Sequence, residues 1–381
     1  MAYFDNAATT YPKPLRVYDF MRDFYMSCGG SYGRGQYSKA QSVGGLVNET
    51  RKMISDLLNC PAKQVVFTPS ATIALNIIIG GLIQKGMKTV YITPFEHNAV
   101  TRILHHYENQ NLITVVQLSV NSALSYDIER IQYQFQSAAP DLVVMSHASN
   151  VIGLVSPVEQ IFNLAKQYGA TTVVDMAQTA GLVGLNVGLD SIDFAVFAGH
   201  KTLFGPTGIS GFVMKPGYAL PAVLFGGTGF ESANQNMPDS IPERYEMGTH
   251  NVAGIAGLNA ALSWILSEGV DSLWKRECIN REKLLTILND YSFLRTVGTH
   301  PDRDYVGIVS CLFDGISSDS AGIVFYERDI SVRTGLQCAP LAHKFLGTFP
   351  AGTIRFSVSA LTTDNDFEDL RRALDSIEDE L

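Results

Sequence analysis

The sequence predicts an α/β fold in which a large domain, built on a mostly parallel seven-stranded sheet, is joined to a smaller α+β domain. Three observations indicate this. Seven short apolar runs alternate with helical patterns between about residues 64 and 215, which is typical of a sheet covered by helices on both faces. After about residue 255 the pattern changes to a long helical stretch, two further strand patterns and a charged helix. The length of 381 residues favours about two domains, and 46% hydrophobic residues are ample for a large core.

The predicted strands of the large domain are runs of four or five residues, rich in β-branched and aromatic side chains. They cover residues 64–68, 89–93, 113–116, 141–145, 172–175, 194–197 and 211–214. Between the fourth and fifth strands the sequence predicts a helix start, with Ser156 as the cap, Pro157 at the first helical position and Glu159 completing a capping box.

The small domain is predicted to contain strands at residues 306–310 and 353–357, followed by the charged helix. In that helix apolar residues recur at steps of three and four, which predicts a stripe that faces the core. The stripe consists of Phe367, Leu370, Leu374, Ile377 and Leu381. We predict an N-terminal segment, residues 1–15, that folds back onto the small domain, a large domain of residues 16–255 and a small domain of residues 256–381.

Composition and charge exclude several classes of function. The net charge of −9 and the lack of any basic run argue against a nucleic-acid-binding surface. The five cysteines are scattered and form no Cys-x-x-Cys pair, so the sequence indicates neither a disulfide framework nor a metal site. It shows no signal-peptide pattern and no apolar run approaching the roughly 18 residues of a membrane span. We therefore expect a cytoplasmic protein that binds neither nucleic acid nor membranes.

Polar clusters follow five of the predicted strands, at the carboxyl ends where open parallel sheets bind ligands. Lys201 follows one strand and lies in a glycine-rich loop, where it can form a Schiff base with the aldehyde of pyridoxal phosphate. Asp175 ends another strand and can pair with the pyridinium nitrogen of that cofactor. Small residues at 70–72 open a helix whose free N–H groups can hold a phosphate. The sequence thus predicts a pyridoxal phosphate site.

Cys338 is the candidate nucleophile of this site. It lies in a loop-like stretch with Arg333 and His343 nearby in sequence, and such neighbours can lower a thiol pKa. A plain aminotransferase needs no nucleophilic thiol, so Cys338 favours a reaction at sulfur. The other cysteines are expected to be buried and structural; they are Cys28, Cys60, Cys278 and Cys311.

Together these residues resemble the class V aminotransferase family of fold type I pyridoxal phosphate enzymes, and within it the cysteine desulfurase and selenocysteine lyase group. The resemblance spans almost the whole chain. Its most specific motifs are Asp5-Asn6-Ala7-Ala8-Thr9-Thr10, Asp175-x-x-Gln178, Gly199-His200-Lys201 and Val332-Arg333-Thr334-Gly335-x-x-Cys338-Ala339.

The resemblance implies a role for each candidate residue. Lys201 would be the Schiff-base lysine, Asp175 would pair with the pyridine nitrogen, and Gln178 would approach the ring hydroxyl. His97 would stack on the ring and help to move protons. Asn150 and Arg355 would hold the substrate carboxylate, which matches the planar fork of an arginine. The phosphate would be bound by Ala71 and Thr72 with help from His200.

Two further features follow from the resemblance. Gly248-Thr249 resembles the segment that a partner subunit contributes to the phosphate site, with Thr249 as the ligand, which implies a homodimer with shared active sites. The short spacing between Arg333 and Cys338 resembles the desulfurases with a compact cysteine loop, which implies a dedicated sulfur acceptor protein. Departures from the family pattern leave substrate preference and acceptor open: Ala198 replaces a common serine, and Tyr37 and Gln337 stand where some relatives carry histidine.

The predicted reaction converts L-cysteine to L-alanine and holds the sulfur as a persulfide on Cys338 for transfer, as in iron–sulfur cluster assembly. Three alternatives stay open. They are a selenocysteine or cysteine-sulfinate lyase, a class V aminotransferase, and a non-catalytic assembly protein, the last disfavoured by the intact candidate residues.

Overall fold

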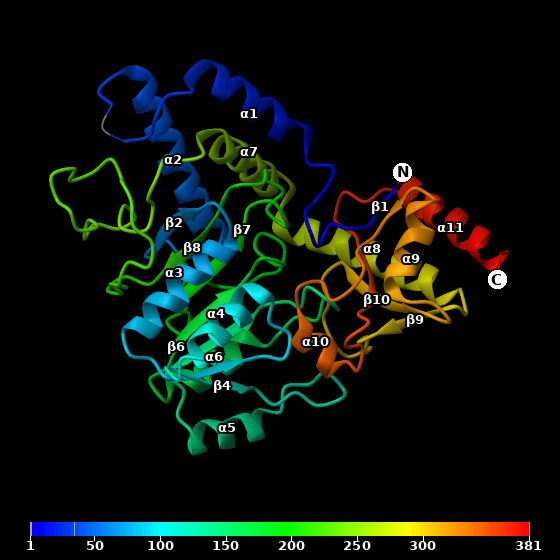
Figure 1. Ribbon diagram of the computed structural model, residues 1–381. Coiled ribbons are helices and arrows are strands. Elements are labelled where there is room, and N and C mark those ends of the chain that lie inside the picture. The colour runs from blue at the N-terminus through cyan, green and yellow to red at the C-terminus, as the bar shows by residue number, and fades with distance from the viewer. Residues whose placement is uncertain (1, 34, 381) are drawn as a thin grey trace.

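The computed structural model describes residues 2–33 and 35–380. Its largest element is a seven-stranded sheet with the strand order β2-β8-β7-β6-β5-β3-β4 (Figure 1). Every predicted strand of the large domain is confirmed to within one residue at each end. The strands are β2 (Gln64–Thr68), β3 (Thr89–Ile92), β4 (Thr114–Gln117), β5 (Leu142–Ser146), β6 (Thr171–Asp175), β7 (Phe194–Ala198) and β8 (Ser210–Met214).

The sheet is mostly parallel, as predicted, because helical crossovers connect its central strands. Strand β8 is the exception and runs antiparallel to both β7 and β2. Only residues 199–209 connect β7 to β8, and a parallel connection needs a longer crossover. The lysine loop is therefore a tight link between adjacent antiparallel strands, which holds Lys201 close to the sheet edge.

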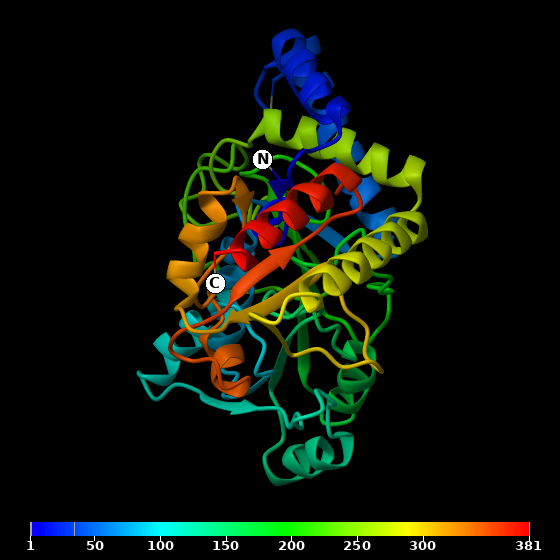
Figure 2. The same ribbon diagram turned by 90° about the vertical axis from the view of Figure 1, so that its right-hand side faces the viewer.

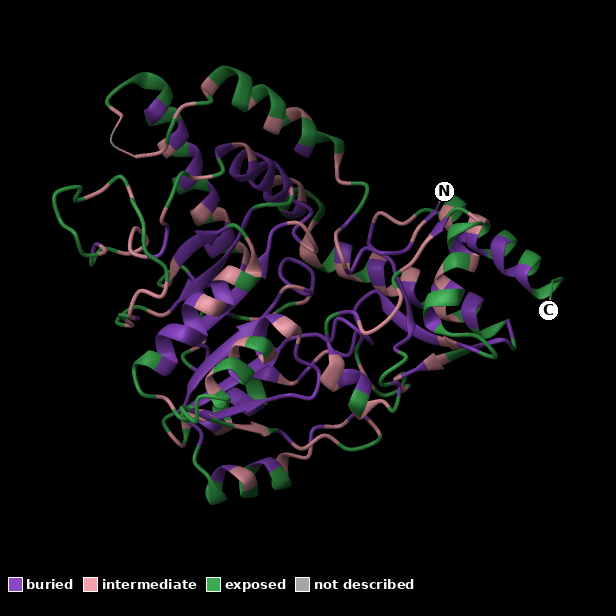
Figure 3. Cartoon of the chain, viewed as in Figure 1, coloured by how far each residue is buried: buried purple, intermediate pink, exposed green. Residues whose placement is uncertain are grey.

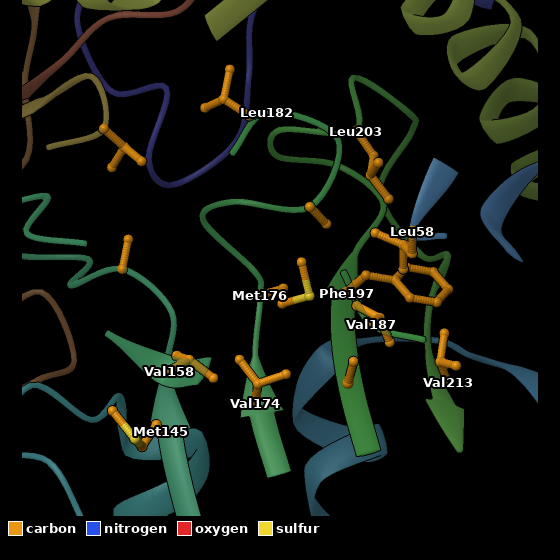
Figure 4. Packing of buried hydrophobic residues seen from close by; sticks show 14 of the residues in the cluster. Leu58, Met145, Val158, Val174, Met176, Leu182, Val187, Phe197, Leu203 and Val213 are labelled. Carbon is orange, nitrogen blue, oxygen red and sulfur yellow. The ribbon is translucent and has the colours of Figure 1, made fainter. Parts of the chain in front are cut away.

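Helices cover both faces of this sheet and make a three-layered body (Figure 1). The helices α3 (Ala71–Gln84) and α4 (Asn98–Glu108) share one core with the sheet. The opposite face packs against α2 (Ser38–Leu57), α5 (Ile128–Ser137), α6 (Val158–Lys166) and α7 (Val252–Glu268). Figure 4 shows this second core, where four adjacent strands contribute Met145, Val174, Phe197 and Val213. Except for the edge strand β4, the strands of this sheet are mostly buried, while exposed residues gather on the outer helices (Figure 3).

The outermost helix, α1 (Leu15–Cys28), packs against α7 and leaves much of its apolar surface uncovered. Its exposed apolar side chains are Leu15, Tyr18, Phe20, Tyr25 and Met26. No helix among the described residues is long and apolar enough to cross a membrane.

The C-terminal part forms a smaller body beside the carboxyl edge of the sheet (Figures 1 and 2). Its three-stranded antiparallel sheet has the order β12-β10-β9. The elements are α8 (Val270–Asn289), β9 (Leu294–Val297), β10 (Ile308–Phe313), α9 (Ser318–Tyr326), β11 (Ile330–Ser331), α10 (Pro340–Phe345), β12 (Ile354–Ser357) and α11 (Asp364–Glu378). Strands β10 and β12 correspond to the two predicted strands, whereas β9 was not predicted.

The N-terminal segment lies against this smaller body. Strand β1 (Ala2–Tyr3) pairs in parallel with β11, and Phe4 packs into the same core as α11. The predicted stripe of α11 is buried at Phe367, Leu370, Leu374 and Ile377, while Leu381 lies outside the described residues. Helix α7 packs against α1 and α2. The domain limits at residues 15 and 255 stay predictions.

The predicted capping box at residues 156–159 is wrong. Helix α6 begins at Val158, and its flanking residue is Pro157 with φ −79° and ψ 63°, without a side-chain cap. The Ser156 hydroxyl instead pairs with the buried hydroxyl of Tyr126 at 2.9 Å. A buried tertiary partner thus takes the side chain that the local pattern assigned to the helix.

Candidate active site

A cavity of about 320 Å³ lies at the carboxyl ends of the large sheet and is closed on one side by the smaller body. It gathers residues from the ends of β2, β3, β5, β6 and β7, from β12 and from the loop before α10. Ten of the predicted site residues line it: Ala71, Thr72, His97, Asn150, Asp175, Gln178, His200, Lys201, Cys338 and Arg355.

One end of the cavity suits an anion. Helix α3 begins there at Ala71, after Ser70, whose hydroxyl accepts a hydrogen bond from the N–H of Ile73 at 3.3 Å. The first N–H groups of a helix have no partner within the helix, and they carry its positive dipole end. His200 also lines this cavity, and its Nδ1 is buried with no hydrogen-bond partner among the described residues. This end can therefore bind a phosphate group.

Lys201 and Asp175 are the two charged groups at the floor of the cavity. Burial lowers the pKa of Lys201 to about 8, with Arg355 acting in the same direction and Asp175 opposing both. Burial raises the pKa of Asp175, against a hydrogen bond from the N–H of Ala177 at 2.9 Å and the charge of Lys201. Gln178 donates from Nε2 to the carbonyl of Ala7 at 2.9 Å, which fixes its amide beside the N-terminal segment.

His97 caps helix α4 and presents a neutral ring to the cavity. Its Nδ1 accepts a hydrogen bond from the N–H of Ala99 at 3.0 Å, so the proton of the neutral ring lies on Nε2. Burial, reinforced by the charge of Lys201, lowers the pKa of His97 to about 4.

The residue before it, Glu96, is fully buried and anchors this turn. Its carboxyl accepts hydrogen bonds from the Thr93 hydroxyl at 2.7 Å and from the Ser146 N–H and hydroxyl, each at 2.8 Å. Burial raises the pKa of Glu96 to about 7. The sequence did not reveal this anchoring, because Thr93 and Ser146 lie at the ends of two different strands.

Arg355 lies on β12 with unused hydrogen-bonding capacity beside the cavity. One terminal nitrogen donates to Asp5 at 2.9 Å and the other to the Asn150 carbonyl at 2.7 Å. Within residues 2–33 and 35–380, neither Nε of Arg355 nor the buried side-chain oxygen of Asn150 has a hydrogen-bond partner. A free guanidinium donor next to an amide is suited to a small polar substrate such as an amino acid.

The N-terminal motif holds both halves of the cavity in place. Asp5 bridges Arg355 and Arg333, each at 2.9 Å. The hydroxyl of Thr10 donates to the Lys201 carbonyl at 2.9 Å, and that of Thr9 to the preceding carbonyl at 3.1 Å. Sequence reasoning recognised this motif only through the resemblance, since its partners lie far away in the chain.

Cys338 lies at the rim of the cavity and is exposed. It also borders a groove of about 570 Å³ between α3 and α4. The predicted neighbours of the thiol are engaged elsewhere: Arg333 with Asp5, and both ring nitrogens of His343 with Gln337 and Thr348 at 2.8 and 2.7 Å. The expected action of His343 on the thiol is therefore not supported, because its ring has no nitrogen left for it.

Thr249 is the predicted site residue that the structure does not bring to the cavity of its own chain. It is exposed and lies next to a buried cluster in which Glu246 binds Arg51 at 2.6 Å and His250 at 2.8 Å. Tyr37 is also exposed and precedes α2, whereas Ala198 and Gln337 line the cavity. Among the other cysteines, Cys60 and Cys311 are buried as expected, and Cys28 and Cys278 are only half-buried.

The cavity residues fit pyridoxal phosphate. A lysine with a lowered pKa, a buried acid and a helix N-terminus match the aldehyde, the ring nitrogen and the phosphate. In the part of the chain that the structure describes, three buried polar atoms without partners belong to residues that line this space, namely Asn150 Oδ1, His200 Nδ1 and Arg355 Nε. Unpaired buried polar atoms are costly in a folded protein, and a bound polar ligand would satisfy them.

A mostly parallel seven-stranded sheet, a smaller body over its carboxyl edge and a lysine in the loop between β7 and β8 define the fold type I architecture of pyridoxal phosphate enzymes. The family model for class-V aminotransferases matches residues 2–370, and the chain belongs to this family.

Several similar proteins and solved structures are named as cysteine desulfurases. A probable cysteine desulfurase from Methanothermobacter thermautotrophicus is 30% identical over 98% of this chain and 94% of that protein. The apo structure of a cysteine desulfurase from Thermococcus onnurineus superposes with a TM-score of 0.91 at 26% identity, covering 100% of this chain and 95% of that one. The cysteine desulfurase CsdA from Escherichia coli, in a structure described as S-sulfonic acid, has a TM-score of 0.85 at 25% identity, covering 100% and 95%.

Proposed function

We propose that this protein is a pyridoxal phosphate-dependent cysteine desulfurase, which converts L-cysteine to L-alanine and keeps the sulfur as a persulfide on Cys338. The observation that carries the proposal is that Cys338 borders the same cavity as Lys201, Asp175 and Arg355. The names of the relatives support the same reaction. The cavity alone fits many enzymes of the family, and the cysteine at its rim singles out the reaction at sulfur.

Seven residues of the cavity would hold the cofactor, with His97 against its ring and Gln178 near the ring hydroxyl. Lys201 would bind it covalently, Asp175 would face the ring nitrogen, and the phosphate would lie at Ala71, Thr72 and His200. Once bound, pyridoxal phosphate supplies an electron sink that stabilises negative charge at the substrate α-carbon.

The side chains that line the cavity around the cofactor would bind the substrate and move its protons. Arg355 would hold the carboxylate through the donor that has no partner. The amine of Lys201, with a pKa of about 8, is partly neutral near neutral pH and can remove the α-proton. His97, neutral because burial keeps its pKa near 4, can donate and accept a proton beside the ring.

Cys338 would take the sulfur. Its thiolate attacks the sulfur of L-cysteine, a sulfur–sulfur bond forms and the bond from Cβ to sulfur breaks. The electron pair of the broken bond stays with the carbon skeleton, which takes a proton at Cβ and regains one at Cα to leave as L-alanine. The sulfur stays as Cys338–S–SH until an acceptor thiol or a reductant removes it.

The test is an assay of protein loaded with pyridoxal phosphate, in which alanine and sulfide from L-cysteine are quantified with and without dithiothreitol. We expect equal alanine and sulfide, with turnover after the first depending on the reductant. Cys338→Ala should abolish persulfide and alanine formation, while Cys28→Ala, outside the cavity, should keep both. Full desulfuration by Cys338→Ala would refute the role of the thiol. Turnover of selenocysteine but not cysteine by that variant would favour a lyase, and a requirement for a keto acid would favour an aminotransferase.

We propose further that the enzyme is a homodimer in which Thr249 of each subunit completes the phosphate site of the other. The exposure of Thr249 and the apolar surface of α1 support this arrangement. Sedimentation should give a dimer, and Thr249→Ala should weaken cofactor binding. The exposed rim position of Cys338 supports transfer to a separate acceptor protein in the cytoplasm.

A further inference from the structure

The loop that carries Cys338 has an unusual backbone. Gln337 and Cys338 are consecutive residues with positive φ, at 40° and 58°, and neither is glycine. Side chains with a β-carbon rarely adopt this left-handed region, so such a conformation persists only where the surroundings hold it. The contacts of these two residues therefore show what fixes the loop.

The side chain of Gln337 is the first fixing element. It is 9% exposed, although it directly precedes an exposed cysteine. Its Nε2 donates to the carbonyl of Thr353 at 2.9 Å, and its Oε1 accepts from the ring of His343 at 2.8 Å. Both partners lie later in the chain, next to β12 and on α10. The amide thus ties the cysteine loop to two elements at once.

His343 is the second fixing element, and its ring is fully buried. Because the Gln337 amide donates through Nε2 to Thr353, its oxygen must accept from His343, which places the histidine proton on Nε2. Nδ1 of His343 then accepts from the Thr348 hydroxyl at 2.7 Å. The direction of every hydrogen bond in this chain of three side chains is set.

Two residues on the large body hold the loop from the other side. The carbonyl of Gln337 accepts from Nδ2 of Asn150 at 2.6 Å, and the carbonyl of Cys338 accepts from the N–H of Asn98 at 2.7 Å. Asn98 directly follows His97. The loop is therefore bonded both to the small body and to the residues proposed to contact substrate and cofactor.

We propose that Gln337 and His343 form a buried lock that fixes the Cys338 thiol at the cavity rim, with Gln337 as a positioning residue for sulfur transfer. The inference rests on the proposed function and extends it. Cys338 borders both the cavity of Lys201 and the groove between α3 and α4. A thiol fixed there can receive sulfur from the cavity and present it to the groove without a swing of the loop.

The test compares Gln337→Leu, which removes every hydrogen bond of the side-chain amide, with Gln337→His, which keeps one donor and one acceptor and tolerates positive φ. The control is Thr334→Ala in the same loop, where the hydroxyl donates to Asp319 at 3.2 Å. The first readout is independent of activity. Amide hydrogen exchange of residues 335–339 and the rate of alkylation of Cys338 by iodoacetamide should both increase in Gln337→Leu and stay near wild type in the other two variants.

The second readout separates positioning from binding. In single turnovers, Gln337→Leu should form alanine about 10-fold or more slowly, because misplacing a reacting group by about 1 Å costs up to about 100-fold. The L-cysteine concentration that half-saturates the cofactor spectrum should change less than about two-fold, and Gln337→His should recover most of the rate.

Three outcomes would overturn the lock. They are wild-type exchange and alkylation in Gln337→Leu, equal loss in Gln337→Leu and Gln337→His, and an effect of Thr334→Ala as large as that of Gln337→Leu. A wild-type protein that makes no alanine from L-cysteine would instead contradict the proposed function, while the exchange comparison would still decide the lock.

Discussion

The Asp5 carboxylate compensates the charge of Arg355, and Asp5→Asn removes this compensation while keeping the shape of the side chain. The pair is almost completely buried, with side-chain exposures of 12% for Asp5 and 4% for Arg355. The second partner of Asp5, Arg333, is 50% exposed. The variant thus leaves one buried and one exposed guanidinium without the negative charge.

The expected loss follows from these exposures. Removing one partner of a buried ion pair costs about 3–5 kcal/mol, and the exposed pair adds at most about 1 kcal/mol. Asparagine still accepts one hydrogen bond, which returns about 1 kcal/mol. We therefore expect a loss of about 2–5 kcal/mol. At about 2.1 cal/mol/K per residue, the 381 residues give an unfolding entropy near 0.8 kcal/mol/K, so Tm should fall by about 3–6 °C.

Thermal unfolding of Asp5→Asn and of a matched control, Asp19→Asn, measures the change in Tm of each variant relative to wild type. Asp19 makes the same kind of contact with Arg22 at 3.3 Å, but the two side chains are 48% and 59% exposed. The control should therefore shift Tm by less than about 1 °C. The loss in Asp5→Asn should persist at 1 M NaCl, because buried pairs are poorly screened. Equal shifts in the two variants would refute the argument that Asp5 compensates a buried charge.

Three further predictions concern other parts of the site. Because the raised pKa of Glu96 favours its protonated form, the contribution of Glu96 to stability is complete below pH 4.5 and is lost as pH rises through about 7. Across that range the unfolding free energy of Glu96→Gln should rise by about 3 kcal/mol relative to that of wild type, and a difference that does not change with pH would contradict this. A β-carbon at Gly352 would lie 2.2 Å from the Gly335 carbonyl, whereas one at Gly347 meets nothing within 4 Å, and both have positive φ; Gly352→Ala should therefore lose about 1–3 kcal/mol more than Gly347→Ala in urea denaturation. Borohydride reduction of wild-type protein loaded with pyridoxal phosphate should increase its mass by that of the attached cofactor, and Lys201→Ala should show no such increase. The same mass increase in the variant would place the attachment at another residue.

The sequence was sufficient for the sheet and most of the cavity. Buried strands are local apolar runs, and polar residues at or shortly after their carboxyl ends, such as His97, Asp175 and Lys201, must meet at one edge of a parallel sheet. This part of the site could therefore be predicted from local sequence patterns.

Contacts between distant segments were not predictable in the same way. The pairing of β1 with β11 involves two strands of two residues each, too short for a periodic pattern. The hydrogen bonds of Gln337 depend on the fold of residues 343–353. Ser156 failed as a helix cap because Tyr126, thirty positions earlier, takes its hydroxyl. In each case a tertiary partner overrides or supplements the local preference.

The ion pair between Asp5 and Arg355 joins residues 350 positions apart, and this has a consequence for synthesis in the cell. Domains begin to fold while the chain is still emerging from the ribosome, starting from the N-terminal side. The seven strands of the large sheet are all made by residue 214, yet Asp5 has no arginine at position 355 to bind until much later. The nascent chain can therefore carry a formed sheet with Lys201 in place long before Arg355, the residue proposed to bind the substrate carboxylate, has been made. Premature termination before β12 would leave a protein with the residues proposed to hold the cofactor but without the arginine proposed to select its amino acid.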